Sequence, residues 1–201
     1  MSAKLFASDI RFFQRILAVA GFYKGPLDGK LTSKVKEAQD EFIKDYEATK
    51  AKMGSFDDRT EMNIRTLIPA AQVKAREFMS IAAKGHPLTC RIISGTRTFA
   101  EQDVLFKQKP KVTNARGGQS NHNFGIAWDV GIFDTGKFLT GATKKEDKAY
   151  SDLGALITKE TKGIEWGGNW KTFVDKPHYQ LATGKSVKQL LALLEKGESF
   201  A

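Results

Sequence analysis

The chain has 201 residues, of which 41% are hydrophobic and 27% are charged. This balance is typical of a globular protein that is long enough to bury a core. No apolar run approaches the roughly 18 residues of a membrane-spanning helix, and the first residues lack the basic region, apolar stretch and cleavage site of a secretory signal. The sequence therefore excludes stable membrane insertion and predicts synthesis in the cytoplasm without a signal peptide.

The formal net charge of +9 predicts attraction to a polyanion, either nucleic acid, anionic lipid or the phosphates of a bacterial envelope. Lys and Arg residues are spread along the chain, without the arginine-rich arm or interleaved aromatic residues of single-strand binders. This spread argues against a nucleic-acid partner and leaves contact with an anionic envelope open. Cys90 lies in a strand-like apolar segment, so we expect a buried free thiol rather than a nucleophile.

The N-terminal third is expected to be helical. Apolar residues spaced along one helical face predict a helix over residues 9–20, with Phe13 among the inward side chains. Turn signals within residues 25–29 separate it from a second helix that runs through Phe42. An acidic turn followed by an apolar face predicts a third, short helix within residues 57–68.

The rest of the chain has a mixed pattern. A helix over residues 70–84, with Val73 in its buried stripe, follows Pro69 and marks a domain boundary. The elements predicted beyond it are a strand at 90–94, a helix at 100–108, strands at 126–133 and 178–181, and helices at 145–158 and 187–195. This order predicts an α+β fold with two domains, residues 1–68 and residues 69–201.

Two of the three histidines, His122 and His178, lie in polar motifs that also contain aspartates. Asp129 follows His122 by seven residues, and in a continuous helix this spacing would separate the side chains by about 10 Å along the axis. Gly125 allows a bend between them, so that His122 comes from a loop and Asp129 from a strand. With His178 from a second strand, the three side chains form a candidate zinc site.

Two imidazoles and one carboxylate suit zinc with a fourth position open for water, whose pKa falls to about 7 on binding. Asp175 precedes His178 by three residues, across a turn, and is the candidate general base for that water. Arg97 stands directly before a capping box formed by Thr98 and Glu101. A guanidinium held at such a corner is suited to stabilise an oxyanion or to bind a substrate carboxylate.

The turn between the first two predicted helices carries a distinctive motif. It consists of Gly21-Phe22-Tyr23, then Gly25-Pro26, then Asp28-Gly29. With the apolar positions on either side, residues 5–68 resemble the three-helix peptidoglycan-binding domain, which implies a wall-binding role for this segment. The sequence departs from that family at Lys30-Leu31, where Phe-Gly is usual, and a small helical bundle that only packs on its neighbour is the alternative.

Three further motifs span about residues 75–181. They are Ser94-Gly-Thr-Arg97 with Gln102, then Ser120-x-His122-x-x-Gly125-x-Ala127-x-Asp129, and Trp166-Gly-Gly-Asn-Trp170 leading into Asp175-x-Pro-His178. They resemble the peptidase family of D-alanyl-D-alanine carboxypeptidases, vancomycin-resistance dipeptidases and L-alanoyl-D-glutamate peptidases of bacteriophage lysins. The Trp-Gly-Gly-x-Trp pattern is more similar to the lysin branch, and the departures are Asn121 and Gln180, where Arg and Glu are frequent.

The resemblance implies a small antiparallel-sheet domain with flanking helices and a zinc ion held by His122, Asp129 and His178. It also implies that Asp175 is the base, that Arg97 acts on a substrate oxygen, and that Ser120 and Gln102 give supporting contacts. Trp166 and Trp170 are candidates to line the substrate groove, with packing of the glycine-rich turn as the alternative.

The leading hypothesis is a monomeric endolysin of bacteriophage origin that hydrolyses stem peptides of bacterial peptidoglycan, between L-Ala and D-Glu, and causes wall lysis. Such lysins reach the wall through a membrane pore, which fits the missing signal. The alternatives are a D,D-carboxypeptidase, a secreted wall-degrading toxin or remodelling enzyme with the same site, and a non-catalytic wall-binding module. A non-haem iron oxygenase would use the same ligands, but it requires a many-stranded barrel that the pattern does not predict.

Overall fold

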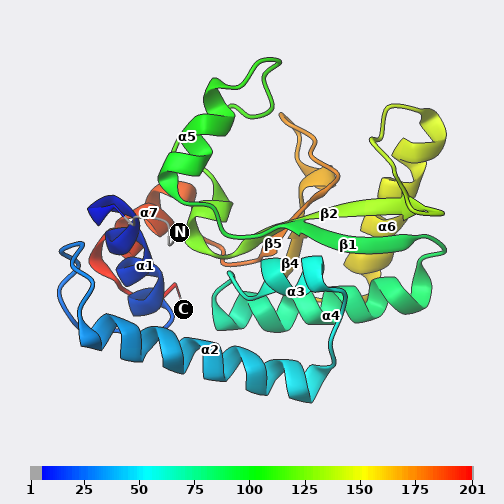
Figure 1. Ribbon diagram of the computed structural model, residues 1–201. Coiled ribbons are helices and arrows are strands. Elements are labelled where there is room, and N and C mark those ends of the chain that lie inside the picture. The colour runs from blue at the N-terminus through cyan, green and yellow to red at the C-terminus, as the bar shows by residue number, and fades with distance from the viewer. Residues whose placement is uncertain (1–5, 201) are drawn as a thin grey trace. The chain divides into compact units, whose positions relative to one another are not determined.

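The computed structural model describes residues 6–200 and confirms the α+β class (Figure 1). Its elements in chain order are α1 (Ala7–Val19), α2 (Ser33–Met53), α3 (Asp58–Ile64), α4 (Pro69–Gly85), β1 (Thr89–Ser94), α5 (Phe99–Lys107), η1 (Asn121–Phe124), β2 (Ala127–Asp134), β3 (Lys137–Phe138), α6 (Lys144–Glu160), β4 (Ile164–Trp166), η2 (Gly167–Asn169), β5 (His178–Leu181) and α7 (Val187–Lys196). Every predicted helix and strand is present, although α2 continues past the predicted end at Phe42. The short elements β3, β4, η1 and η2 were not predicted, because two to four residues give no periodic signal.

The chain folds into two compact units. One consists of Met1–Ala48, Arg97–Gly125 and Thr183–Ala201, and the other of Thr49–Thr96 and Ile126–Ala182. The chain passes between the units more than once, so each contains segments that are distant in sequence. The division into a wall-binding segment and a peptidase segment at residue 68 stays a prediction. No helix within residues 6–200 is both long and apolar enough to cross a bilayer.

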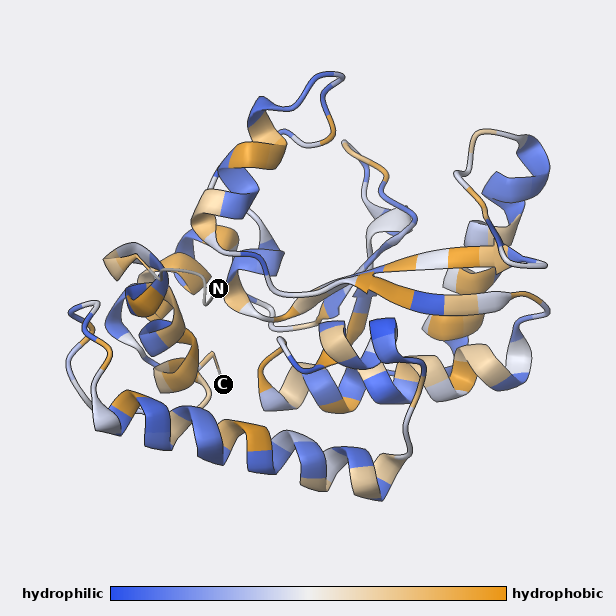
Figure 2. Ribbon diagram, viewed as in Figure 1, coloured by the Kyte–Doolittle hydropathy of each residue, from blue (hydrophilic) through white to orange (hydrophobic). Residues whose placement is uncertain are grey.

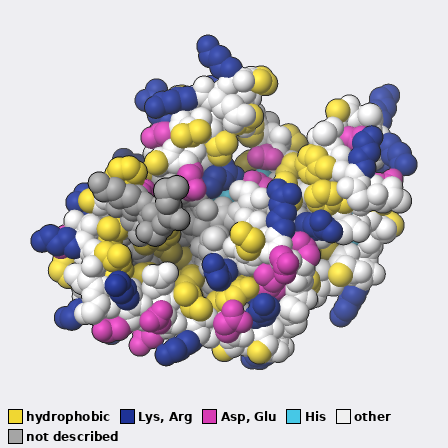
Figure 3. Space-filling model, in the orientation of Figure 1, with side chains coloured by type: hydrophobic (Ala, Val, Ile, Leu, Met, Phe, Trp, Pro, Cys, Tyr) yellow, Lys and Arg dark blue, Asp and Glu magenta, His cyan; other side chains and the backbone are white. Residues whose placement is uncertain are grey.

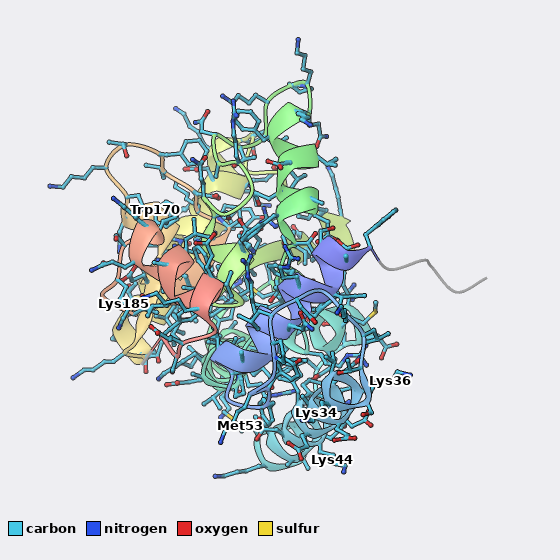
Figure 4. All side chains as sticks on the ribbon, turned by 90° about the vertical axis from the view of Figure 1, so that its left-hand side faces the viewer. Lys34, Lys36, Lys44, Met53, Trp170 and Lys185 are labelled. Carbon is cyan, nitrogen blue, oxygen red and sulfur yellow. The ribbon has the colours of Figure 1, made fainter. Side chains whose placement is uncertain are left out.

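The first unit has a small core between α1 and α2. Buried apolar side chains from both helices and from the connecting turn meet there: Leu17, Tyr23, Val35, Ala38 and Phe42. On the outer side of α2, Lys34, Lys36 and Lys44 are exposed and project away from this core (Figure 4). The alternation of apolar and charged residues therefore fixes which side of α2 is buried.

Two side chains of α1 differ from the sequence-based expectation. Phe13, predicted to point inward, is 45% exposed, whereas Phe12 is 5% exposed. Phe12 packs edge to face on Phe99 of α5, with ring centroids 5.6 Å apart, so the helix is rotated toward α5. Gln14 is fully buried, and its side chain accepts a hydrogen bond of 2.8 Å from the backbone of Gly29, which fixes the turn before α2.

The second unit contains a five-stranded antiparallel sheet. Its strands lie in the order β1, β2, β5, β4, and β3 pairs with β2. Figure 2 shows hydrophobic colouring over most of β2, in agreement with its burial. Phe78 of α4 packs on the rings of Trp128 and Tyr179, at centroid distances of 6.2 Å and 4.6 Å. The face of the sheet that carries these rings is therefore the core face.

The helix α4 also corrects one prediction. Val73 was expected in the buried stripe but is 40% exposed, whereas Ala71 and Ala75 are fully buried. Small side chains at these positions allow the helix backbone to approach its neighbours closely, and this rotates Val73 outward. Cys90 is buried as predicted, and burial raises the pKa of its thiol to about 12, so the thiol stays protonated at neutral pH.

The helix α3 is tied to the outer edge of the sheet. The amide of Asn63 donates to the carbonyl oxygen of Ile92 at 3.1 Å, and the backbone of Ile92 donates to the hydroxyl of Thr60 at 3.1 Å. These bonds satisfy polar backbone groups that an edge strand would otherwise leave open. The outermost long strand, β1, is therefore covered by side chains of α3.

Charged side chains are distributed over the surface. On the face shown in Figure 3, Lys and Arg are interspersed with Asp and Glu rather than gathered in one stripe. The one fully buried cation among the described residues is Arg76 of α4, which forms two hydrogen bonds of 2.9 Å and 2.7 Å with the carboxylate of Glu61 in α3. Arg76 also donates to the carbonyl oxygen of Gly54 at 2.8 Å. This buried pair joins α3 to α4. Removal of either partner would leave the other charge buried without its counterion.

Replacing one partner of this pair will destabilise the protein. We expect Glu61→Ala to lower the free energy of unfolding by about 3–5 kcal/mol, because it leaves the Arg76 charge buried without its carboxylate. Urea denaturation followed by circular dichroism measures this loss. Lys148→Ala, which removes an exposed pair with Asp152, is the control and should cost at most about 1 kcal/mol. Equal effects of the two changes would contradict the assigned role of the buried pair.

Candidate metal centre and active site

Asp129 and His178 are brought together by the pairing of β2 with β5. In this antiparallel register Trp128 lies opposite Tyr179, and Asp129 lies opposite His178. Trp128 and Tyr179 point into the core, so the alternation of side chains along each strand directs Asp129 and His178 to the other face. There the Oδ1 atom of Asp129 lies 3.3 Å from the Nδ1 atom of His178.

The environment of His178 favours a positive charge. The residue is 5% exposed, and this burial lowers the pKa of its ring. The hydrogen bond and the charge of Asp129 raise the pKa and outweigh burial, with smaller contributions from Gln180 and from the charge of Asp175. The resulting pKa lies above the usual histidine value, so the position beside Asp129 attracts a cation, either a proton or a metal ion.

The glycines after Trp166 are required by close packing. A Cβ atom at Gly168, or at Gly154 of α6, would overlap the indole of Trp166. The indole nitrogen of Trp166 donates to the carbonyl oxygen of Lys176 at 2.8 Å. Trp166 therefore anchors the loop that leads to β5, which favours the packing interpretation of this residue over contact with substrate.

Gly167 sets the position of Asp175. The backbone of Asp175 donates to the carbonyl oxygen of Gly167 at 3.1 Å, and the backbone of His178 donates to the carbonyl oxygen of Asp175 at 3.2 Å. A Cβ atom at Gly167 would lie 2.5 Å from the backbone oxygen of Asp175 and 3.1 Å from Cβ of His178. The absence of a side chain at Gly167 thus lets the candidate base and the candidate ligand sit in one tight turn.

His122 belongs to the short helix η1 and is 2% exposed. Gly125 ends this helix with φ of 69°, a left-handed conformation that glycine adopts without strain. The predicted bend at Gly125 is therefore confirmed. It redirects the chain from η1 into β2, on which Asp129 lies.

Arg97 is held in the same unit as His122. The backbone of Arg97 donates to the carbonyl oxygen of His122 at 3.0 Å, and the Nη1 atom of Arg97 donates to the amide oxygen of Gln102 at 3.0 Å. Gln102 is fully buried, and its own amide nitrogen donates to the carbonyl oxygen of Ala115 at 3.0 Å. The predicted capping box of Thr98 is present, and it begins α5 directly after Arg97.

Sequence analysis did not single out Asn123. This residue is fully buried, and its amide nitrogen donates to the carbonyl oxygens of Arg97 and Thr98, at 2.9 Å and 3.3 Å. Its amide oxygen accepts hydrogen bonds from the backbone of Gly118 and Ser120. Asn123 thus joins the two motifs, and the only signal in the sequence is a polar residue directly after the candidate ligand.

Two further residues, Trp170 and Ser120, were predicted to contact the substrate. The ring of Trp170, labelled in Figure 4, lies 4.9 Å from the ring of His178, centroid to centroid. Ser120 is half-buried and directly precedes η1. Trp170 is therefore adjacent to a candidate ligand, whereas Trp166 is occupied by packing.

The three predicted ligands form one group. Ligand atoms of His122, Asp129 and His178 all lie within 4.8 Å of one another, and both histidines are buried. Nitrogen and carboxylate donors in this number match metal sites that retain an open position for water. In an α+β fold that has, within residues 6–200, no many-stranded barrel, a site of this kind is typical of metal-dependent hydrolases.

Comparison with known proteins places the chain within this class. Residues 113–181 match the family described as D-alanyl-D-alanine carboxypeptidase. The chain is 36% identical over 113 residues to the peptidoglycan L-alanyl-D-glutamate endopeptidase CwlK of Bacillus subtilis, an alignment that covers 52% of this chain and 68% of that protein. The solved structure of the Serratia marcescens L-Ala D-Glu endopeptidase ChiX is 26% identical, with a TM-score of 0.48, and covers 63% of this chain and 88% of that one.

The match to the Bacillus protein covers more than two thirds of that protein, which is enough to assign the family. The chain belongs to the M15 family of peptidoglycan peptidases. The matched residues 113–181 include the three candidate ligands and Asp175, whereas Arg97 lies outside them.

The close approach at Gly167 generates a prediction. Gly167→Ala should weaken metal binding by about tenfold or more, because the added methyl group displaces the turn that carries Asp175 and His178. Metal affinity is measured by competition with a fluorescent chelator. Gly184→Ala is the control, since a Cβ atom there would meet nothing within 4 Å, although its φ of 66° adds backbone strain. Unchanged metal affinity in Gly167→Ala would show that the turn does not depend on this contact.

Proposed function

We propose that this protein is a zinc-dependent endopeptidase that hydrolyses the bond between L-Ala and D-Glu in the stem peptides of bacterial peptidoglycan. The observation that carries the proposal is the group of two buried histidines and one half-buried aspartate in a member of this peptidase family. The relative of 36% identity is named for this bond, which favours it over others.

The residues present fit zinc. Two ligands of a tetrahedral zinc ion with bonds of about 2.0–2.1 Å lie about 3.3–3.4 Å apart. The 3.3 Å between Asp129 Oδ1 and His178 Nδ1 matches this spacing, and His122 supplies the third donor. A zinc ion held there would polarise the scissile carbonyl and lower the pKa of a water molecule in the open position.

Asp175 is proposed as the general base. Its backbone is fixed by hydrogen bonds to Gly167 and His178, and its charge acts on the ring of His178. A carboxylate in this position takes a proton from the attacking water and delivers it to the leaving amine. The same group therefore serves in both halves of the reaction.

Arg97 is proposed to stabilise the negative charge that develops on the carbonyl oxygen. Its guanidinium is held by the buried Gln102, so it loses little freedom when it binds a substrate oxygen. In this proposal Gln102 supports catalysis through its contact with Arg97. Ser120 and Trp170 are the proposed neighbours of the stem peptide.

The biological setting is also a proposal. The motif in residues 21–29 resembles wall-binding domains, and attachment to the wall would raise the local concentration of enzyme at its substrate. Together with the similarity to lysins, this supports an endolysin that degrades the wall during release of bacteriophage. The net charge of +9 would assist its approach to an anionic envelope.

Digestion of purified peptidoglycan tests the reaction. We expect soluble fragments with new D-Glu amino termini, identified by mass spectrometry, which disappear with a chelator and return when zinc is added. The matched family is described as a D-alanyl-D-alanine carboxypeptidase, so release of free D-Ala is the second candidate outcome and would identify that activity instead. Intact peptidoglycan despite bound zinc would contradict both.

The role of Asp175 has its own test. Asp175→Asn preserves the size of the side chain but cannot accept the proton, so kcat should fall by about 10²- to 10⁴-fold while zinc binding stays unchanged. The matched control is Asp152→Asn, an exposed carboxylate on α6, which should keep full activity. Wild-type turnover in Asp175→Asn would exclude this residue as the base.

A further inference from the structure

Glu165 and Gln180 lie on the same face of the sheet as the candidate ligands. Glu165 of β4 is directly opposite Gln180 of β5, and Asp129 of β2 is opposite His178 of β5. Residues two apart on one strand share a face, so His178 and Gln180 point the same way, and their cross-strand partners point with them. The register therefore sets four polar side chains next to one another.

Three of these side chains, Glu165, Gln180 and His178, form a chain of hydrogen bonds in the second unit, which we call the relay. The Nε2 atom of Gln180 donates to the carboxylate of Glu165 at 2.7 Å, and the Oε1 atom of Gln180 lies 3.0 Å from Nε2 of His178. Gln180 is 8% exposed. Solvent therefore has little access to replace either bond, and the loss of one would leave a buried polar group unsatisfied.

The chemistry of the groups decides which atom donates and which accepts in each of these hydrogen bonds. A carboxylate only accepts hydrogen bonds, so Glu165 must receive the amide hydrogen of Gln180. The amide oxygen of Gln180 then faces the ring, and an amide oxygen also only accepts. Nε2 of His178 must therefore carry a hydrogen, which leaves Nδ1 as the nitrogen that can bind a metal ion.

The Nδ1 atom of His178 faces a carboxylate oxygen. Nδ1 of His178 lies 3.3 Å from Oδ1 of Asp129. An unprotonated nitrogen and a carboxylate oxygen repel each other at this distance unless a cation lies between them. Glu165 and Gln180 thus select the ring form in which His178 and Asp129 share a cation.

From these contacts we infer that Gln180 and Glu165 are positioning residues for the metal ligand His178. The inference rests on the zinc site proposed above and deepens it. Gln180 holds the ring in the Nε2–H form, and Glu165 prevents the amide of Gln180 from turning over. The departure of Gln180 from the family pattern is matched in this chain by the carboxylate of Glu165 across the strand pair.

The first test removes the acceptor. Gln180→Met preserves side-chain length but cannot accept from the ring, so the affinity for zinc should fall by about 10- to 100-fold. The control is Gln72→Met, the same change at a fully buried glutamine of α4 whose amide donates to the carbonyl oxygen of Leu67. We expect its zinc affinity to stay within about twofold of wild type, because it has no partner in the relay. Competition with a fluorescent chelator measures both affinities.

The second test exchanges the two side chains. Gln180→Glu alone sets two carboxylates side by side and should weaken zinc binding, because their repulsion disturbs the relay. The double variant Glu165→Gln with Gln180→Glu restores one amide donor and one carboxylate acceptor in reversed order. Its zinc affinity should recover to at least that of wild type, which a purely structural role of Gln180 does not predict.

Nitrogen NMR of histidine-labelled protein loaded with zinc gives a readout independent of catalysis. We expect His178 to carry its hydrogen on Nε2 and the metal on Nδ1 in the wild type. Metal on Nε2, or equal zinc affinities for Gln180→Met and Gln72→Met, would overturn the relay while leaving the zinc enzyme in place. A wild-type protein that binds no zinc would instead overturn the proposed function together with the relay.

Discussion

The pairing of β2 with β5 is the constraint on which the candidate site depends. One register sets Trp128 opposite Tyr179 on the core face and Asp129 opposite His178 on the other face. A slip of one residue would exchange the two faces, burying charged groups in the core and exposing aromatic rings. The hydrophobic packing of Phe78 on the core face therefore also fixes the polar pair on the opposite face. Stability and chemistry rely on the same alternation.

The tight turn before β5 extends this constraint to the candidate base. Trp166 is clamped between glycines, and Gly167 contacts both Asp175 and His178. Close packing on the indole thus explains the glycines of the Trp-Gly-Gly motif. A rigid turn of this kind holds a base and a ligand in a defined relation, which a mobile loop would not do.

The second unit contributes two of the proposed ligands and also the residues that support one of them. A ligand histidine is effective only if its other ring nitrogen has a partner that fixes the ring. Gln180 supplies that partner, and Glu165 orients Gln180. In the first unit Arg97 is supported in a comparable way by Gln102 and Asn123. The side chains of His178 and Arg97 are thus each supported by the amide of a buried glutamine.

The sequence by itself determined the classes of element, the bend at Gly125, the capping box at Thr98 and the identity of the candidate ligands. These features are local: they depend on periodicity, on one left-handed glycine, and on scarce residue types in short motifs. Only the tertiary structure decided the rotation of α1 and α4, because Phe13 and Val73 are as apolar as the neighbours that are buried instead. It also decided the partnership of Glu165 with Gln180, since cross-strand pairs join residues that are distant in sequence and no local pattern encodes their register.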